Sequence, residues 1–237
     1  MLKIENLHKK FGATEVLHGV NLEVGDGEIC GFIGQNGAGK TTTLRCSVGI
    51  LEFEEGHITI DGIDIRKDPL AAKRILAYLP DNPDLYDNLS CMQYLHFIAD
   101  LYQVDESVRT RRIEELGKEL EIFDRLGDAI KTLSHGMKQK IAVISAFLHD
   151  PKLLVLDEPF VGLDPQSTFI LKQKMHALCD RGGSVFFSSH VLEVVENLCD
   201  HLVIIKSGVV IKDGATDSIL TDGKNLEEIF LHLEAEQ

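Results

Sequence analysis

A glycine-rich segment followed by lysine and threonine is the strongest candidate for chemistry in the sequence. Gly34-Gln-Asn-Gly-Ala-Gly-Lys-Thr41 has the spacing G-x-x-x-x-G-K-[ST], and it lies between an apolar run and a segment expected to be helical from about Gly39. Glycines let successive backbone N–H groups point at one phosphate, and a helix N-terminus adds its positive dipole end. The lysine can reach the β- and γ-phosphates, and the threonine can ligate Mg²⁺. We therefore predict a nucleotide-binding loop formed by Gly34, Asn36, Gly37, Ala38, Gly39, Lys40, Thr41 and Thr42.

Two adjacent carboxylates follow a second apolar run. Residues 153–156 are all Leu or Val, and Asp157 and Glu158 come directly after them. Ligands bind at the carboxyl ends of parallel strands, so we expect Asp157 beside the phosphate loop, holding Mg²⁺ directly or through water. Glu158 should point differently and polarise the attacking water. Alone, Asp-Glu-Pro is more often a solvated turn; with the phosphate loop it indicates a nucleotide hydrolase.

Buried strands must bring these groups together. Apolar runs alternate with helical patterns in the second half, which is typical of a parallel α/β sheet. Asp61-Gly62 predicts a hairpin and hence an antiparallel edge. The expected fold is α/β: a P-loop NTPase core with a mostly parallel sheet, an antiparallel β edge subdomain and a small helical subdomain. We expect strands at residues 2–7, 20–24, 29–33, 57–60, 63–65, 153–156, 185–187, 202–206 and 209–212.

The helical subdomain is predicted from a change of periodicity near residue 85. Ser90-x-x-Gln93 has the pattern of a capping box, and apolar residues then recur at helical spacing. Further helices are expected at residues 137–148, from Pro165, and at about residues 225–233. We expect one domain over residues 1–237, with a catalytic core of about 1–84 and 150–237 and a helical subdomain of about 85–149.

The composition excludes several classes of protein. Hydrophobic residues make up 44% and charged residues 26%, as in ordinary globular chains, and the formal net charge of −14 argues against a nucleic-acid partner. The first residues contain no apolar h-region, and no apolar run approaches the roughly 18 residues of a membrane span. We expect a cytoplasmic chain. Its five cysteines never occur as C-x-x-C, so neither zinc nor a disulfide framework is implied.

Taken in order, these motifs resemble one family, the ATP-binding subunits of ATP-binding-cassette transporters. Leu133-Ser-His-Gly-Met-Lys-Gln-Lys140 resembles the signature of that family. Gly162-Leu-Asp164 is similar to its D-loop, and Ser188-Ser-His190 is similar to the segment that carries its switch histidine. With the phosphate loop and the two carboxylates, the ordered set covers nearly the whole chain.

The resemblance implies further site residues. Ser134 and Gly136, expected just before a helix, and Gln139 would contact a nucleotide held by a second subunit. Asp164 would be a dimer contact. His190 would contact the γ-phosphate and act in catalysis beside Glu158; a lone histidine after an apolar strand is otherwise usually a packing residue.

Three positions depart from the family pattern or have two interpretations. Phe11 stands where the family generally has an aromatic residue that stacks on adenine, but it could instead be a core residue. Asp81 occupies the place of the family's Q-loop glutamine; it could approach Mg²⁺ or be a solvated loop acid. His135 replaces a glycine of the signature, and we expect an exposed loop histidine without chemistry.

The function implied is an ATPase, converting ATP and water to ADP and phosphate, that energises a separately encoded membrane-spanning permease through ATP-driven dimerisation. Its partner ATPase would be a second copy or a homologous subunit, and it would lie peripherally on the inner face of the cell membrane. Asp81 and residues 82–86 resemble the bacterial bacitracin and daunorubicin exporter branch. The alternatives are a soluble cassette ATPase of iron–sulfur-cluster assembly and a ribosome-associated cassette protein, though the latter generally carries two cassettes or a long insertion.

Overall fold

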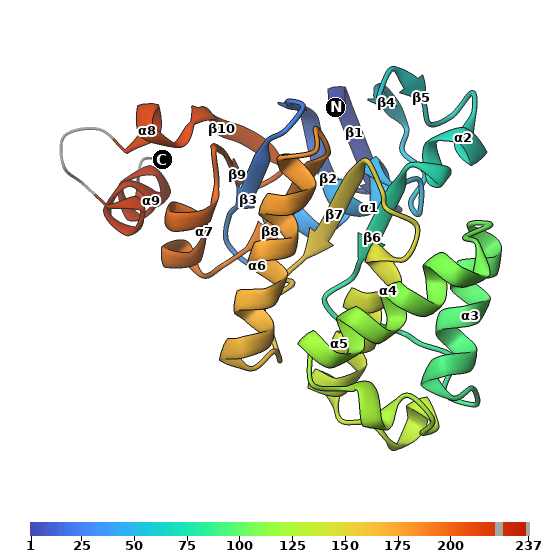
Figure 1. Ribbon diagram of the computed structural model, residues 1–237. Helices are drawn as coiled ribbons and strands as arrows, with labels where there is room; N and C mark the ends of the chain where they lie inside the picture. Colours follow the sequence, from blue (N-terminus) through green and yellow to red (C-terminus); the bar gives the residue numbers. More distant parts are fainter. Residues whose placement is uncertain (221–224, 236–237) are drawn as a thin grey trace.

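A mixed six-stranded sheet forms the centre of the computed structural model, which describes residues 1–220 and 225–235 (Figure 1). Its strand order is β10-β9-β3-β8-β7-β6, and every neighbouring pair is parallel except β9 and β10. The inner strands β3, β7 and β8 are buried at every position and mostly apolar, because both faces of the sheet are covered. The strands are β3 (Ile29–Ile33), β6 (Leu76–Leu79), β7 (Leu153–Asp157), β8 (Ser184–Ser189), β9 (His201–Lys206) and β10 (Val209–Ala215).

A second, antiparallel sheet has the order β2-β1-β4-β5. The turn at Asp61 and Gly62, both at positive φ, joins β4 to β5 and confirms the predicted hairpin. Two expected strands are longer than predicted, because the pairing of Phe11 with Thr14 continues the ladder through polar residues whose side chains can face solvent. The strands are β1 (Leu2–Phe11), β2 (Thr14–Val24), β4 (Glu55–Ile60) and β5 (Ile63–Asp64).

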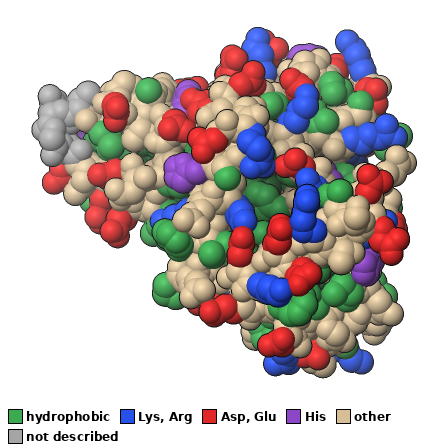
Figure 2. Space-filling model, viewed as in Figure 1, with side chains coloured by type: hydrophobic (Ala, Val, Ile, Leu, Met, Phe, Trp, Pro, Cys, Tyr) green, Lys and Arg blue, Asp and Glu red, His purple; other side chains and the backbone are tan. Residues whose placement is uncertain are grey.

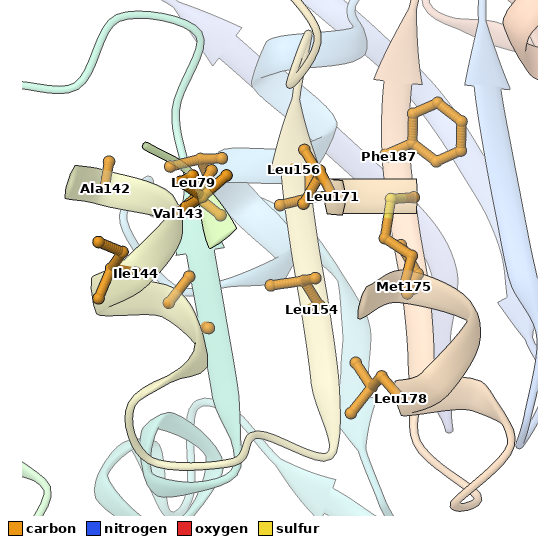
Figure 3. Packing of buried hydrophobic residues seen from close by; sticks show 14 of the residues in the cluster. Leu79, Ala142, Val143, Ile144, Leu154, Leu156, Leu171, Met175, Leu178 and Phe187 are labelled. Carbon is orange, nitrogen blue, oxygen red and sulfur yellow. The ribbon is translucent and has the colours of Figure 1, made fainter. Parts of the chain in front are cut away.

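Alternating side chains of the six-stranded sheet enter two separate hydrophobic cores. On one face, Leu154 and Leu156 of β7 pack with α5 and α6, as Figure 3 shows. On the other face, Leu153 and Val155 join a core shared with the antiparallel sheet and α1. The helices that flank the sheets are α1 (Lys40–Ser47), α2 (Pro69–Arg74), α6 (Pro165–Cys179), α7 (Leu192–Leu198), α8 (Thr216–Ile219) and α9 (Leu226–Ala235).

Three helices stand together at one side of the six-stranded sheet, beyond β6 (Figure 1). Ser90 and Gln93 form the predicted capping box: Ser90 Oγ accepts from the Gln93 N–H at 3.1 Å, and Gln93 Oε1 accepts from the Ser90 N–H at 2.8 Å. These helices are α3 (Cys91–Leu101), α4 (Glu106–Glu119) and α5 (His135–Phe147), with short 3₁₀ helices at Phe123–Arg125 and Ile130–Thr132.

Charged side chains of both signs lie on the surface, and the cysteines lie in the interior. Figure 2 shows acidic and basic side chains interspersed over the face in view. Within residues 1–220 and 225–235, no helix combines the length and apolarity that crossing a bilayer requires. All five cysteines are buried with free thiols: Cys30, Cys46, Cys91, Cys179 and Cys199.

Candidate active site

A pocket of about 330 Å³ lies over the phosphate loop, between the end of β3 and the start of α1. Most of the predicted loop residues line it, and the chain adds Phe11, Asp81 and Glu158 from three distant segments. Gly34 and Ala38 are buried and do not line the pocket. The fold therefore brings together groups that the sequence separates by more than a hundred positions.

The loop glycines are required by the backbone path. Gly37 and Gly39 have φ of 85° and 111°, values that residues with a side chain rarely adopt. Gly39 is the N-cap of α1 and gives no side-chain cap, so the first N–H groups of the helix remain available to an anion. A Cβ on Gly34 would collide with the carbonyl oxygen of Ile205 in β9. The loop is thus shaped for close approach of a phosphate.

Lys40 lies folded into the loop. Its Nζ donates to the carbonyl oxygens of Gly34 at 2.7 Å and Gln35 at 3.3 Å, and only 7% of the residue is exposed. Burial lowers the pKa of Lys40, while the charges of Glu158 and Asp157 oppose that shift. An ammonium has three donors, so this one is held by the loop with a donor to spare for a phosphate oxygen.

Asp157, the last residue of β7, has one carboxylate oxygen without a partner. Its Oδ1 accepts from Ser188 Oγ at 2.6 Å, whereas the buried Oδ2 has no hydrogen bond among the described residues. An unpaired buried carboxylate oxygen is costly, and a divalent cation would satisfy it. The donor set of Asp157 and Thr41 therefore fits Mg²⁺. Sequence reasoning missed the role of Ser188, which depends on the pairing of β7 with β8.

Glu158 turns away from its neighbour Asp157 because its backbone is left-handed, with φ of 48°. Its N–H donates to the Ser188 carbonyl oxygen at 3.2 Å and to Ser188 Oγ at 3.1 Å. Its Oε2 accepts from His190 Nδ1 at 2.8 Å and from the His190 N–H at 3.2 Å. A carboxylate can only accept, so Nδ1 of His190 carries the proton in this hydrogen bond.

Phe11 and Asp81 lie at the rim of the pocket. Half of Phe11 is exposed, and Lys9 Nζ lies 5.2 Å from its ring centroid, so the core-residue alternative is wrong. An exposed ring at this position can stack on a planar base. Asp81 is exposed, and its Oδ1 accepts from the N–H of Asn82 at 2.8 Å. It is a loop acid that also faces the nucleotide pocket.

The signature residues lie outside this pocket. Ser134 is exposed and caps α5, its Oγ accepting from the Met137 N–H at 3.3 Å. Because this cap starts the helix at His135, Gly136 lies inside α5 and not before it, which corrects the prediction. Gln139 is fully buried and its Nε2 donates to the Pro159 carbonyl oxygen at 3.4 Å. In this arrangement its side chain does not reach a surface where a nucleotide could bind.

Asp164 also has a local partner that the sequence did not suggest. It is the N-cap of α6, where Oδ1 accepts from the Ser167 N–H at 2.8 Å, and Oδ2 forms an ion pair with Lys140 Nζ at 2.7 Å. Its side chain remains 44% exposed. A dimer contact and a helix cap are therefore compatible at this residue.

Comparisons with known proteins identify the family of the chain. The ABC transporter family model matches residues 17–161. The chain is 36% identical to the ABC transporter ATP-binding protein NatA of Bacillus subtilis strain 168, covering 92% of this chain and 90% of NatA. It is 35% identical to the linearmycin resistance ATP-binding protein LnrL of the same organism, covering 90% and 69%.

A solved structure of an ATP binding subunit of an ABC transporter superposes with a TM-score of 0.94 at 34% identity, covering 99% of both chains. The family match, the relatives and this structural likeness all point to one family. The chain belongs to the ATP-binding subunits of ABC transporters, and it is an ATP-binding, ATP-hydrolysing protein.

Proposed function

We propose that this chain powers export through a separately encoded, membrane-spanning permease. The observation that carries the proposal is the pocket over the phosphate loop, which both Lys40 and Glu158 line. The transporter family supports a permease partner. Export is supported by the likeness to LnrL, whose name assigns it to linearmycin resistance.

The proposed chemistry is phosphoryl transfer to water. The loop N–H groups and Lys40 hold the β- and γ-phosphates, and Thr41 and Asp157 would hold Mg²⁺, which supplies neutralisation of phosphate charge. His190 engages Oε2 of Glu158, which leaves Oε1 to orient the attacking water and take its proton. We propose that His190 contacts the γ-phosphate from a neighbouring pocket, which it lines together with Gln35 and Asn36 of the phosphate loop.

We propose that Asp81 contributes to the metal site only through its charge at the pocket rim. One of its oxygens is already held by the Asn82 N–H, which fixes the carboxylate in its own loop. The orphaned oxygen of Asp157 is the better ligand, because it is buried and has no competing donor among the described residues. Phe11 would stack on adenine beside the loop.

Two copies would form the working ATPase. Ser134 lies exposed at the N-terminus of α5, outside the pocket that contains Lys40 in the same chain. A helix N-terminus with exposed N–H groups suits a γ-phosphate, which a second copy would supply in a head-to-tail pair. This one chain contains both halves of such a site, which supports a homodimer; a homologous subunit would fit the same geometry.

Attachment to the inner face of the membrane would follow from binding the permease. Apolar side chains are exposed along α3 and in the loop before it: Tyr86 is 56% exposed, Phe97 39% and Leu101 62%. Tyr86 and Phe97 contact each other edge to face at 5.6 Å between ring centroids. Exposed aromatic side chains of this kind are enriched at protein interfaces.

The test is to purify the tagged chain from its native cells after mild detergent extraction and to identify bound proteins by mass spectrometry. We expect a multi-span protein, and we expect the Tyr86→Ser, Phe97→Ser double variant to lose it while still binding ATP. A soluble assembly factor in place of any membrane protein would reject the transporter and support the cytosolic assembly ATPase.

A further inference from the structure

The first two turns of α5 are fastened to residues 159–164, here called the post-β7 segment. Lys140 Nζ forms an ion pair with Asp164 Oδ2 at 2.7 Å, and Gln139 Nε2 donates to the Pro159 carbonyl oxygen at 3.4 Å. Gly136 faces the carbonyl of Gly162 so closely that any Cβ would collide with it. Both ends and the middle of the segment are therefore attached to the helix that Ser134 caps.

The post-β7 segment is short and internally tied. The Val161 N–H donates to the Glu158 carbonyl oxygen at 3.2 Å, and the Leu163 N–H donates to the Phe160 carbonyl oxygen at 3.3 Å. The Phe160 ring packs edge to face on Phe187 of β8 at 5.8 Å. Because these contacts hold the post-β7 segment in one conformation, a shift of α5 would move the segment and with it Glu158, the residue immediately before the segment.

The ion pair at the end of the segment is well placed to resist such a shift. The Lys140 side chain is only 12% exposed, while that of Asp164 is 44% exposed. The hydrogen bond from Lys140, followed by those from Ser167, lowers the pKa of Asp164 to about 2. Partial burial of the lysine strengthens the attraction relative to a surface pair.

We propose that Lys140 is a positioning residue that couples the Ser134 end of α5 to the placement of Glu158 in the same chain, and thereby links the two ATP sites of the dimer. The inference rests on the proposed function, because it requires a nucleotide of the second copy at Ser134. That nucleotide would hold α5, the post-β7 segment would follow, and Glu158 would be set for hydrolysis in its own site. Each site would then sense whether the other is filled.

The first experiment measures phosphate release by the purified full chain against ATP concentration. Replacing Lys140 by Met keeps the aliphatic stem and removes the charge, and small displacements of a catalytic group lower kcat roughly 10- to 100-fold. We expect this fall in kcat in Lys140→Met. We also expect its Hill coefficient for ATP to fall toward the value for two sites that act independently. Lys140→Arg should restore both. ATP affinity of the single chain, measured by titration, should stay unchanged.

Lys138 provides the matched control. It lies on the same helix and forms an ion pair of the same 2.7 Å length, but with Asp87 outside the post-β7 segment. We expect Lys138→Met to keep the kcat and the Hill coefficient of the wild type. Equal losses in Lys138→Met and Lys140→Met would reject a specific role for Lys140. Lys140→Gln, a milder change, serves if the Met variant has a lowered melting temperature.

A double-mutant cycle separates the coupling from the proposed function. Ser134→Ala is made alone and in the Lys140→Met chain, and the factors by which kcat falls are compared. If Lys140 transmits the effect of a nucleotide bound at Ser134, Ser134→Ala should lower kcat by a much smaller factor in the Lys140→Met chain than in the wild type. If Ser134→Ala lowers kcat by the same factor in both chains, Lys140 does not couple Ser134 to Glu158. The proposal that two copies form the ATPase would still stand. No effect of Ser134→Ala on its own would overturn the dimeric site, and the coupling with it.

Discussion

Asp157 and Glu158 are adjacent carboxylates with different environments. Asp157 ends a buried strand, is 1% exposed and keeps one oxygen unpaired, whereas Glu158 is left-handed and faces His190. A negative charge on buried Asp157 is costly unless a cation lies beside it. Glu158 is placed so that it can exchange a proton. The backbone turn between them gives the two carboxylates the different surroundings that the proposed roles, Asp157 toward Mg²⁺ and Glu158 toward water, require.

Replacing Glu158 by Gln should separate ATP binding from hydrolysis. The amide can still accept from His190 but cannot take a proton, so turnover at saturating ATP should fall by at least about 100-fold. Nucleotide affinity should remain near that of the wild type. Phosphate release and a nucleotide titration measure the two quantities. Lys40→Ala is the contrasting control and should lose nucleotide binding; near-normal hydrolysis by Glu158→Gln would remove the residue from its role.

Residue types and spacing sufficed to predict the groups that lie next to each other in the sequence. The phosphate loop and the carboxylate pair are local patterns, and their chemistry follows from local backbone geometry. The environment of Gln139 could not be predicted, because its burial depends on the packing of α5 against Pro159, twenty positions away. The Lys140–Asp164 ion pair has the same long-range origin.

At the scale of elements, close approach of strands restricts the turn after β3. Gly34 has an ordinary φ, so the need for glycine arises from β9, whose Ile205 carbonyl occupies the space of a Cβ. The Ile205 carbonyl is part of the backbone of β9, which is paired with β3, so it cannot move aside as a side chain would. The lengths of the elements were harder to predict. Strands β1 and β2 extend through polar residues, because hydrogen-bond pairing, and not apolarity, decides where the two strands end.

Gly34→Ala should therefore destabilise the fold and weaken ATP binding together. Overpacking of this kind costs roughly 1–3 kcal/mol in the free energy of unfolding, which denaturant titration measures. Gly127→Ala is the matched control, because Gly127 has nothing within 4 Å of an added Cβ and no positive φ. We expect a change within about 0.5 kcal/mol there. Equal stability of the two variants would contradict the steric argument.

At the scale of the whole molecule, His149 joins the helical group to the six-stranded sheet. Its ring stacks on Tyr102 with centroids 3.6 Å apart, and its Nε2 donates to the Leu76 carbonyl oxygen of β6 at 3.0 Å. Burial lowers the pKa of His149 to about 4 from an ordinary value of 6.5. The junction is therefore assembled around a neutral imidazole.

The free energy of unfolding should fall as the pH is lowered, because His149 is held neutral in the folded chain. Below its ordinary pKa the unfolded chain takes up a proton that the folded chain does not, so the contribution is present above about pH 6.5 and is lost toward pH 4. Between pH 7 and 5 the loss should be roughly 2 kcal/mol. In His149→Gln the free energy of unfolding should change less over that range, whereas the variant of exposed His176, His176→Gln, should follow the wild type. Identical slopes in all three chains would exclude His149 as the cause.

The five buried cysteines make the two cores chemically distinguishable. Cys91, Cys179 and Cys199 lie in the core beneath α5 and α6, while Cys30 and Cys46 lie in the core beneath the antiparallel sheet. Burial raises the pKa of every one of these thiols, and only an accessible thiolate reacts with an alkylating reagent. Alkylation of these cysteines therefore requires the structure to open locally. The order in which the two sets of cysteines are alkylated would show which side of the central sheet opens first.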